Sequence, residues 1–215
     1  MAHVLLQKML EAIPEEALPP TWRDLDRVHF SKSKTLWDYQ QAALGNAVRM
    51  LWKYYQDIQD YRPGEGREVN HRRKAQLWWW YEINGLREDF SVSPSRLQPR
   101  LGQALAERYE TERRAGNDVL PYEHFINRMG FWMATGSGKT LIIVNLVEIL
   151  WHLIRRGEIP PHPILILTHR DDLLEQLKRY VDEFNRDRGE PWILLRELRE
   201  YPQTLRESPS LFREG

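Results

Sequence analysis

Cysteine is absent from the 215 residues of the sequence, so disulfide bonds and thiolate metal ligands are excluded. A surplus of one charge is also absent, because lysine plus arginine and aspartate plus glutamate both number 31. A chain without net charge has no overall positive field. We therefore expect any affinity for nucleic acid to come from a local patch of the surface.

Long hydrophobic runs are absent as well. The longest apolar stretches, 141–153 and 164–167, are too short or too interrupted to span a bilayer. The N-terminal stretch 1–16 is broken by Gln7 and Lys8 and has no small-residue cleavage site, unlike a signal peptide. The seven histidines show no metal-ligand spacing such as H-E-x-x-H. These absences favour a cytoplasmic protein without a membrane partner.

The residues that are present indicate a globular protein with three regions. Residues 1–34 read as a short helix followed by a Pro-rich connector, and residues 35–120 as a helical region. The strongest helix of that region opens at "TLWDYQQAAL", where Thr35 and Asp38 stand in capping-box spacing. Gly116 is placed as the stop of its last helix.

The third region, 121–215, alternates apolar strands with helices. "FINRMGFWM" (125–133), "PILILT" (163–168) and "PWILLREL" (191–198) read as buried strands. Helices are predicted between them, over 139–157 and 170–189. Strands and helices that alternate with short connections predict an α/β fold, with a parallel sheet and helices on its faces.

The octapeptide "MATGSGKT" (133–140) joins the first of these strands to the first helix. Its Gly138, Lys139 and Thr140 match the right half of the phosphate-loop pattern G-x-x-x-x-G-K-[ST], whereas Met133 stands where the pattern has its first glycine. Gly136 and Gly138 allow the backbone N–H groups to curl towards phosphate oxygens, and the helix aims its positive end at the same anion. The alternative is an ordinary Gly/Ser turn, but the strand before it and the helix after it favour a nucleotide phosphate.

"MATGSGKT" resembles motif I of superfamily 2 helicases and translocases, most closely the DEAD/DEAH-type group that contains the type III restriction enzyme res subunits. "ILILTHRDDLLEQ" (164–176) is similar to motif Ia of that group. "LWDYQQAAL" (36–44) resembles the segment before motif I whose glutamine reads adenine. The resemblance implies a RecA-like P-loop lobe, whose parallel sheet is incomplete here, preceded by a helical region with an insertion at 45–120.

The resemblance also implies the site residues. Gln40 would bond adenine with Trp37 or Tyr39 near the base, although 99 positions separate Gln40 from Lys139. The triphosphate of ATP would be held by the loop from Thr135 to Thr140, that is by Thr135, Gly136, Ser137, Gly138, Lys139 and Thr140. Lys139 would reach the β- and γ-phosphates, and the Thr140 hydroxyl would hold Mg²⁺.

Motif Ia supplies the expected contact with DNA. By the resemblance, the phosphodiester backbone would meet Thr168, His169 and Arg170. Such side chains at the carboxyl end of a parallel strand also stand where ligands bind in these sheets. The alternative reading of "THRDD" is a helix start in which Asp171 and Asp172 favour the helix dipole, and both readings can hold at once.

An acidic residue at the end of a further strand is needed for hydrolysis. Asp182 and Glu183 imitate such a pair, but the apolar residues around them trace one helical face and assign the pair to the solvated side of a helix. We therefore expect the N-terminal part of a helicase or translocase that binds ATP and turns it over poorly alone. A second ATPase lobe, and subunits of a restriction or defence system, would be its partners. The alternative is a non-catalytic nucleotide-binding and interaction module.

A basic and aromatic segment, "NHRRKAQLWWWYEI" (70–83), also stands out. It places Arg72, Arg73 and Lys74 beside Trp78–Trp80, a combination that can bind single-stranded nucleic acid. A helix does not point three consecutive tryptophans at one strand. We therefore favour an amphipathic helix with tryptophans packed on the core and the basic turn in water.

Overall fold

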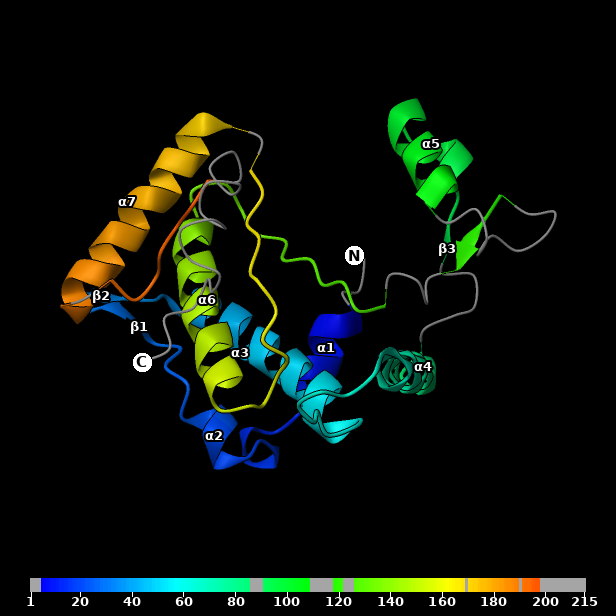
Figure 1. Cartoon of the computed structure of the whole chain (residues 1–215), viewed down its shortest axis with the longest axis horizontal. Coiled ribbons are helices and arrows are strands. Elements are labelled where there is room, and N and C mark those ends of the chain that lie inside the picture. Colours follow the sequence, from blue (N-terminus) through cyan, green and yellow to red (C-terminus); the bar gives the residue numbers. More distant parts are fainter. Residues whose placement is uncertain are drawn as a thin grey trace.

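The computed structural model places a helical N-terminal region against two long helices that follow the phosphate loop (Figure 1). It describes residues 5–85, 91–108, 118–121, 126–168, 170–189 and 191–197. The chain opens with α1 (Leu5–Glu11), a 3₁₀ turn (Glu15–Ala17) and α2 (Pro20–Arg23). A short antiparallel hairpin follows, in which β1 (His29–Ser31) pairs with β2 (Lys34–Thr35). This hairpin was not predicted.

The predicted helix of the second region is confirmed as α3 (Asp38–Trp52), which continues into a π-helical turn, η2 (Lys53–Asp57). Its start differs from the prediction, because Thr35 lies in β2. The cap is instead made by Gln40, whose side-chain Oε1 accepts a hydrogen bond of 2.8 Å from the backbone N–H of Trp37. A glutamine at this position turns back on the helix start and satisfies a backbone donor that would otherwise be unpaired.

The insertion between α3 and the phosphate loop is also mainly helical. It contains α4 (Arg67–Ile83), a 3₁₀ turn (Pro94–Arg96) and α5 (Pro99–Arg108). Two short antiparallel strands, β3 (Ser91–Val92) and β4 (Leu120–Pro121), bring the two ends of the α5 segment together. The predicted helix stop at Gly116 lies outside the described residues.

Two helices follow the phosphate loop as predicted, α6 (Lys139–Arg155) and α7 (Asp171–Arg188). Their apolar faces meet α3 and β1 in the larger of two hydrophobic clusters. The deepest members of this cluster include Leu44 and Val48 of α3, Ile149 and Leu153 of α6, and Phe184 of α7. Full burial of each such side chain stabilises the fold by roughly 1.5–3 kcal/mol, so this packing fixes α3 against α6.

The predicted parallel sheet is not formed in the described part of the chain. There the strands belong to the two antiparallel pairs already given, while 126–133, 163–168 and 191–197 run as irregular chain. Leu165 is 64% and Leu167 79% exposed, although their apolar run predicted a buried strand. The segment 191–197 is held instead by the side-chain amide of Asn185, which exchanges two hydrogen bonds with the backbone of Ile193 (2.8 and 2.9 Å).

The physical reason lies in what makes a strand. A run of apolar residues supplies the side chains of a buried strand, but its backbone must find a neighbouring strand for its hydrogen bonds. The three segments do not pair with one another here, so their pattern predicts strand character without producing a sheet. Within the described residues, no helix combines the length and the apolar character needed to cross a membrane.

Candidate nucleotide-binding site

The loop before α6 curls because two of its glycines adopt left-handed backbone conformations. Gly136 has φ 78°, and Gly138, the N-cap of α6, has φ 74° and ψ 30°. Residues with a side chain strongly disfavour the left-handed backbone conformation, whereas glycine adopts it freely. The turn is closed by the backbone N–H of Ser137, which donates to the carbonyl of Ala134 at 3.3 Å.

The start of α6 is suited to an anion. No side chain caps its first turn, so the N–H groups there and the positive end of a 17-residue helix face the loop. The Ser137 hydroxyl oxygen is buried and has no hydrogen-bond partner in the described structure. Unpaired donors at a helix N-terminus, beside a glycine loop, form a phosphate-binding arrangement.

Lys139 reaches back across this loop. Its ammonium donates to the carbonyls of Met133 (3.1 Å) and Ala134 (2.7 Å). An ammonium has three N–H donors, so one remains for a phosphate oxygen while the carbonyls hold the side chain in place. The two hydrogen bonds thus hold Lys139, the one positive side chain of the loop, against the loop backbone.

Thr140 is the second residue of α6 and faces α7. Its hydroxyl donates to the side-chain oxygen of Gln176 at 3.5 Å, a long hydrogen bond between the two helices. The hydroxyl oxygen keeps lone pairs for a cation. Among the described residues, no group of three or more His, Asp or Glu side chains could hold a metal ion. Gln176 was not expected at this site, and only its place at the end of "DDLLEQ" could have indicated it.

Gln40 lies on the phosphate loop despite the long separation in sequence. Its Nε2 donates to the backbone carbonyl of Ser137 at 2.8 Å, and the hydroxyl of Tyr39 donates to the same carbonyl at 3.0 Å. Gln40 is only 4% exposed. A Cβ on Gly138 would lie 2.4 Å from the Gln40 Nε2 and would displace this amide, in addition to straining the left-handed backbone. The start of α3 and the loop therefore form one structural unit.

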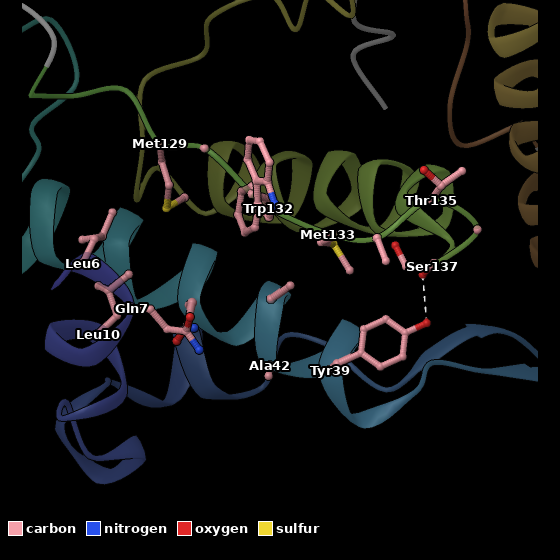
Figure 2. A pocket seen from close by; sticks show the side chains of 16 residues that line it. Leu6, Gln7, Leu10, Tyr39, Ala42, Met129, Trp132, Met133, Thr135 and Ser137 are labelled. Atoms are coloured by element: carbon pink, nitrogen blue, oxygen red, sulfur yellow. Dashed lines mark hydrogen bonds between the residues drawn. The ribbon is translucent and has the colours of Figure 1, made fainter. Parts of the chain in front are cut away.

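A groove of about 840 Å³ runs from the loop along α3 to α1 (Figure 2). Figure 2 shows Tyr39 beneath the loop with its hydroxyl bonded to Ser137, and Trp132 and Met133 above α3. Trp132 is fully exposed. Grooves of this size hold small organic ligands, and this one begins where the triphosphate would lie. Of the two aromatic candidates for the base, Tyr39 lines the groove, whereas Trp37 is not among its lining residues and is 70% exposed.

The predicted DNA-contacting residues lie at the start of α7. The backbone N–H of Arg170 donates to the Thr168 hydroxyl at 3.5 Å, and the guanidinium of Arg170 forms two hydrogen bonds with Asp172 (2.8 and 2.5 Å). The side-chain hydrogen bond from Arg170 lowers the pKa of the Asp172 carboxyl. Asp171 and Asp172 stand in the first turn of α7, as the helix-start reading predicts. His169 lies outside the described residues.

The acidic pair Asp182–Glu183 is on α7, as predicted. Glu183 accepts from the ammonium of Lys34, with N–O distances of 2.6 and 2.9 Å to its two carboxylate oxygens. This contact ties α7 to β2 and gives Glu183 a structural partner. The pair therefore does not stand at the end of a strand beside the loop.

A glycine loop, a helix N-terminus and a lysine over the loop define a phosphate-loop nucleotide-binding module. Residues 92–198 match the family model of the type III restriction enzyme res subunit. By this match that part of the chain, about half of its length, belongs to the res-subunit family and to the N-terminal domain of superfamily 2 helicases. The searches of curated proteins and of solved structures found no match. The module is thus a helicase-family ATP-binding module, and this family generally uses ATP with Mg²⁺.

Proposed function

We propose that this chain holds Mg·ATP in the first motor lobe of a superfamily 2 DNA helicase or translocase, in a restriction or defence system. The proposal is supported by hydrogen bonds between two segments that are distant in sequence. The start of α3 and the phosphate loop share the Ser137 carbonyl, through Tyr39 and Gln40. In a RecA-like lobe, one segment meets the base and the other the triphosphate, so their contact supports a single ATP site.

The triphosphate is placed by the loop from Thr135 to Thr140. The two carbonyl bonds of Lys139 leave one N–H, which would donate to a phosphate oxygen while the charge of the ammonium attracts both the β- and the γ-phosphate. Backbone N–H groups of the α6 start bind the remaining phosphate oxygens. Thr140 would hold Mg²⁺ through the lone pairs of its hydroxyl oxygen, and the ion would supply positive charge to neutralise the phosphates.

The base is placed by the α3 start. Gln40 uses one N–H on Ser137 and one lone pair on the Trp37 N–H, so a second N–H and a second lone pair are left. This is the donor and acceptor pair that an adenine edge requires. Tyr39 offers its exposed ring from the adjoining groove. Base recognition and loop geometry are therefore linked through one side chain.

DNA is proposed to contact the α7 start at Thr168, His169 and Arg170. Arg170 is 60% exposed at its side chain and lies at the N-terminus of the helix. Its ion pair with Asp172 positions the guanidinium in the absence of a phosphate. Since Gln176 of the same helix meets Thr140, α7 joins the proposed DNA contact to the cation ligand.

Hydrolysis is proposed to need groups beyond those of this site. Glu183 of the acidic pair is bound by Lys34 of β2 and Asp182 is exposed on α7, so the carboxylate for Mg²⁺ and water, and an arginine finger from a second lobe, are proposed to come from elsewhere in the working motor. We expect this chain to bind Mg·ATP and to hydrolyse it barely above background.

The test is the steady-state ATPase rate of the full-length protein with and without DNA. DNA is expected to raise the rate, and Lys139→Ala is expected to abolish it. Lys32→Ala is the matched control, since this exposed lysine lies in the β1–β2 turn and its backbone N–H binds Asp187, near the C-terminal end of α7. A rate that does not respond to DNA, or that survives Lys139→Ala, would contradict the proposed motor function.

A further inference from the structure

The inner face of α4 is buried, as expected of an amphipathic helix, but it includes Arg73 of the basic turn, which was expected in water. Arg73, Leu77 and Tyr81 are buried, and the guanidinium of Arg73 binds both carboxylate oxygens of Glu65 (2.6 and 3.0 Å). It also donates to the backbone carbonyl of Gln59 at 3.2 Å. The middle member of the basic cluster is therefore a core residue, engaged by the turn that precedes α4.

The outer face of the same helix does not follow the expectation. A second hydrophobic cluster lies between α1, α3 and α4 and includes Leu10, Met50 and Leu77. Trp78 and Trp80 are half-buried against it, whereas Trp79 does not belong to it and is 61% exposed. Ile83, one turn further, is 58% exposed. A tryptophan so exposed leaves a large apolar ring in water, and its neighbours on the helix decide what it can meet.

The nearest exposed neighbours of Trp79 include Gln76, the acidic Glu82 and Ile83, and the basic Arg72 lies two turns before it. At spacings of i, i+4, i+7 and i+11 the helix presents one exposed stripe, Arg72, Gln76, Trp79 and Ile83, here named the α4 stripe. Arg67 and Lys74 add positive charge in the same half of α4 as Arg72. Within the part of the chain that the structure describes, none of these three cations has an ion-pair partner.

Charge and ring geometry together select one class of ligand. Cations without an ion-pair partner among the described residues favour an anionic ligand, and an exposed indole on the same stripe as a guanidinium favours a ligand with flat rings. A single-stranded nucleic acid offers both, since its phosphates are charged and its bases are free to stack. The bases of a duplex are already stacked, and an acidic peptide has no comparable ring at each position. Arg72 and Trp79 lie about 10 Å apart along the helix, a span that a short run of nucleotides covers.

The position of the stripe separates it from the ATP site. In Figure 1, α4 lies on the opposite side of α1 and α3 from α7, where the proposed motor contact with DNA is placed. We infer that the α4 stripe binds single-stranded nucleic acid independently of ATP, with a base stacked on Trp79 and a phosphate on Arg72. The insertion would thus bind a single strand of nucleic acid at a site separate from the DNA contact proposed at the start of α7.

The experiment titrates the chain into fluorescein-labelled oligothymidine and follows anisotropy over a range of salt concentrations. Trp79→Ala is expected to weaken binding roughly five- to a hundredfold, the usual effect of losing one stacked base. Trp79→Phe retains a ring and is expected to retain most of the affinity. Arg72→Ala is expected to lower the slope of log K against log salt by about 0.7. Arg179→Ala, an equal loss of charge on the exposed side of α7, is the control and leaves the slope unchanged.

Several outcomes would overturn the inference. These are equal affinity for wild type and Trp79→Ala, tighter binding of a blunt duplex than of the single strand, or no binding of the oligonucleotide. Loss of a captured protein partner in Trp79→Ala, with oligonucleotide binding unchanged, would assign the stripe to a protein instead. Oligouridine in parallel separates RNA from DNA. Unchanged affinity of Trp79→Ala for a fluorescent ATP analogue, with an unchanged circular dichroism melt, distinguishes this surface from the ATP site and from misfolding.

Discussion

Replacing Gly138 by alanine tests the contact between the phosphate loop and α3. The left-handed conformation at this position (φ 74°) costs a non-glycine residue about 1–2 kcal/mol. The new Cβ would also lie 2.4 Å from the Gln40 Nε2, so that amide must move off the Ser137 carbonyl. Loss of this hydrogen bond adds about 0.5–1.5 kcal/mol, so the total loss of stability is roughly 1.5–3.5 kcal/mol.

Gly136→Ala is the matched control for this substitution. Gly136 has nearly the same φ, 78°, but a Cβ there meets nothing within 4 Å. Only the conformational cost of about 1–2 kcal/mol is expected. The free energy of unfolding, measured by urea denaturation, should therefore fall further for Gly138→Ala than for Gly136→Ala. In a Gln40→Ala background the difference should shrink to the effect of the remaining contact with Leu141 Cδ1, at 3.3 Å. Equal losses in the wild-type background, or a difference that Gln40→Ala does not reduce, would refute the proposed contact.

Three further predictions concern the site and its support. Gln40→Ala is expected to lower the preference for ATP over GTP in competition titrations, and an unchanged preference would limit Gln40 to bracing the loop. Thr140→Val keeps the shape of the side chain, so ATP affinity without Mg²⁺ should persist while its enhancement by Mg²⁺ is lost; retained enhancement would remove Thr140 from the cation site. Arg73 lowers the pKa of Glu65 chiefly by its side-chain hydrogen bond. The stability from this pair is therefore present above the unfolded pKa of about 4.3 and is lost as pH falls through the lowered pKa. The urea concentration at the unfolding midpoint should fall at acid pH in wild type, and this part of the fall should be missing in Glu65→Gln. If the midpoint depended on pH in the same way in both proteins, the role of the pair would be contradicted.

The long helices and the phosphate loop could be predicted because their signals are local. Spacing of apolar residues marks α3, α6 and α7, and two glycines with Lys-Thr mark the loop. The contact of Gln40 with the loop could be expected only from the resemblance, since 99 positions separate Gln40 from Lys139 and no pattern spans that distance.

The remaining features depend on partners that are distant in sequence. The apolar runs around Leu165 and Ile193 predicted strands, but strand pairing is decided by neighbouring backbone, and Asn185 occupies the backbone of Ile193 instead. Arg73 looked like one of three surface cations, yet Glu65 and the carbonyls beside it make it a core residue. Helical periodicity alone did not show which of Arg72 and Arg73 is buried. The groups that bind Arg73, Glu65 and the Gln59 carbonyl, belong to the turn before α4, which the periodicity of α4 does not include.

Calorimetric titration of Mg·ATP into the wild-type chain and into Lys139→Ala tests the central claim most directly, that the loop and the α3 start form one ATP site. Lys139 lies over the loop, held by two of its carbonyls. Lys139→Ala is expected to weaken ATP binding at least tenfold, about 1.4 kcal/mol or more, while Lys32→Ala binds as wild type does. Equal affinity of the wild-type chain and Lys139→Ala for Mg·ATP would contradict the account.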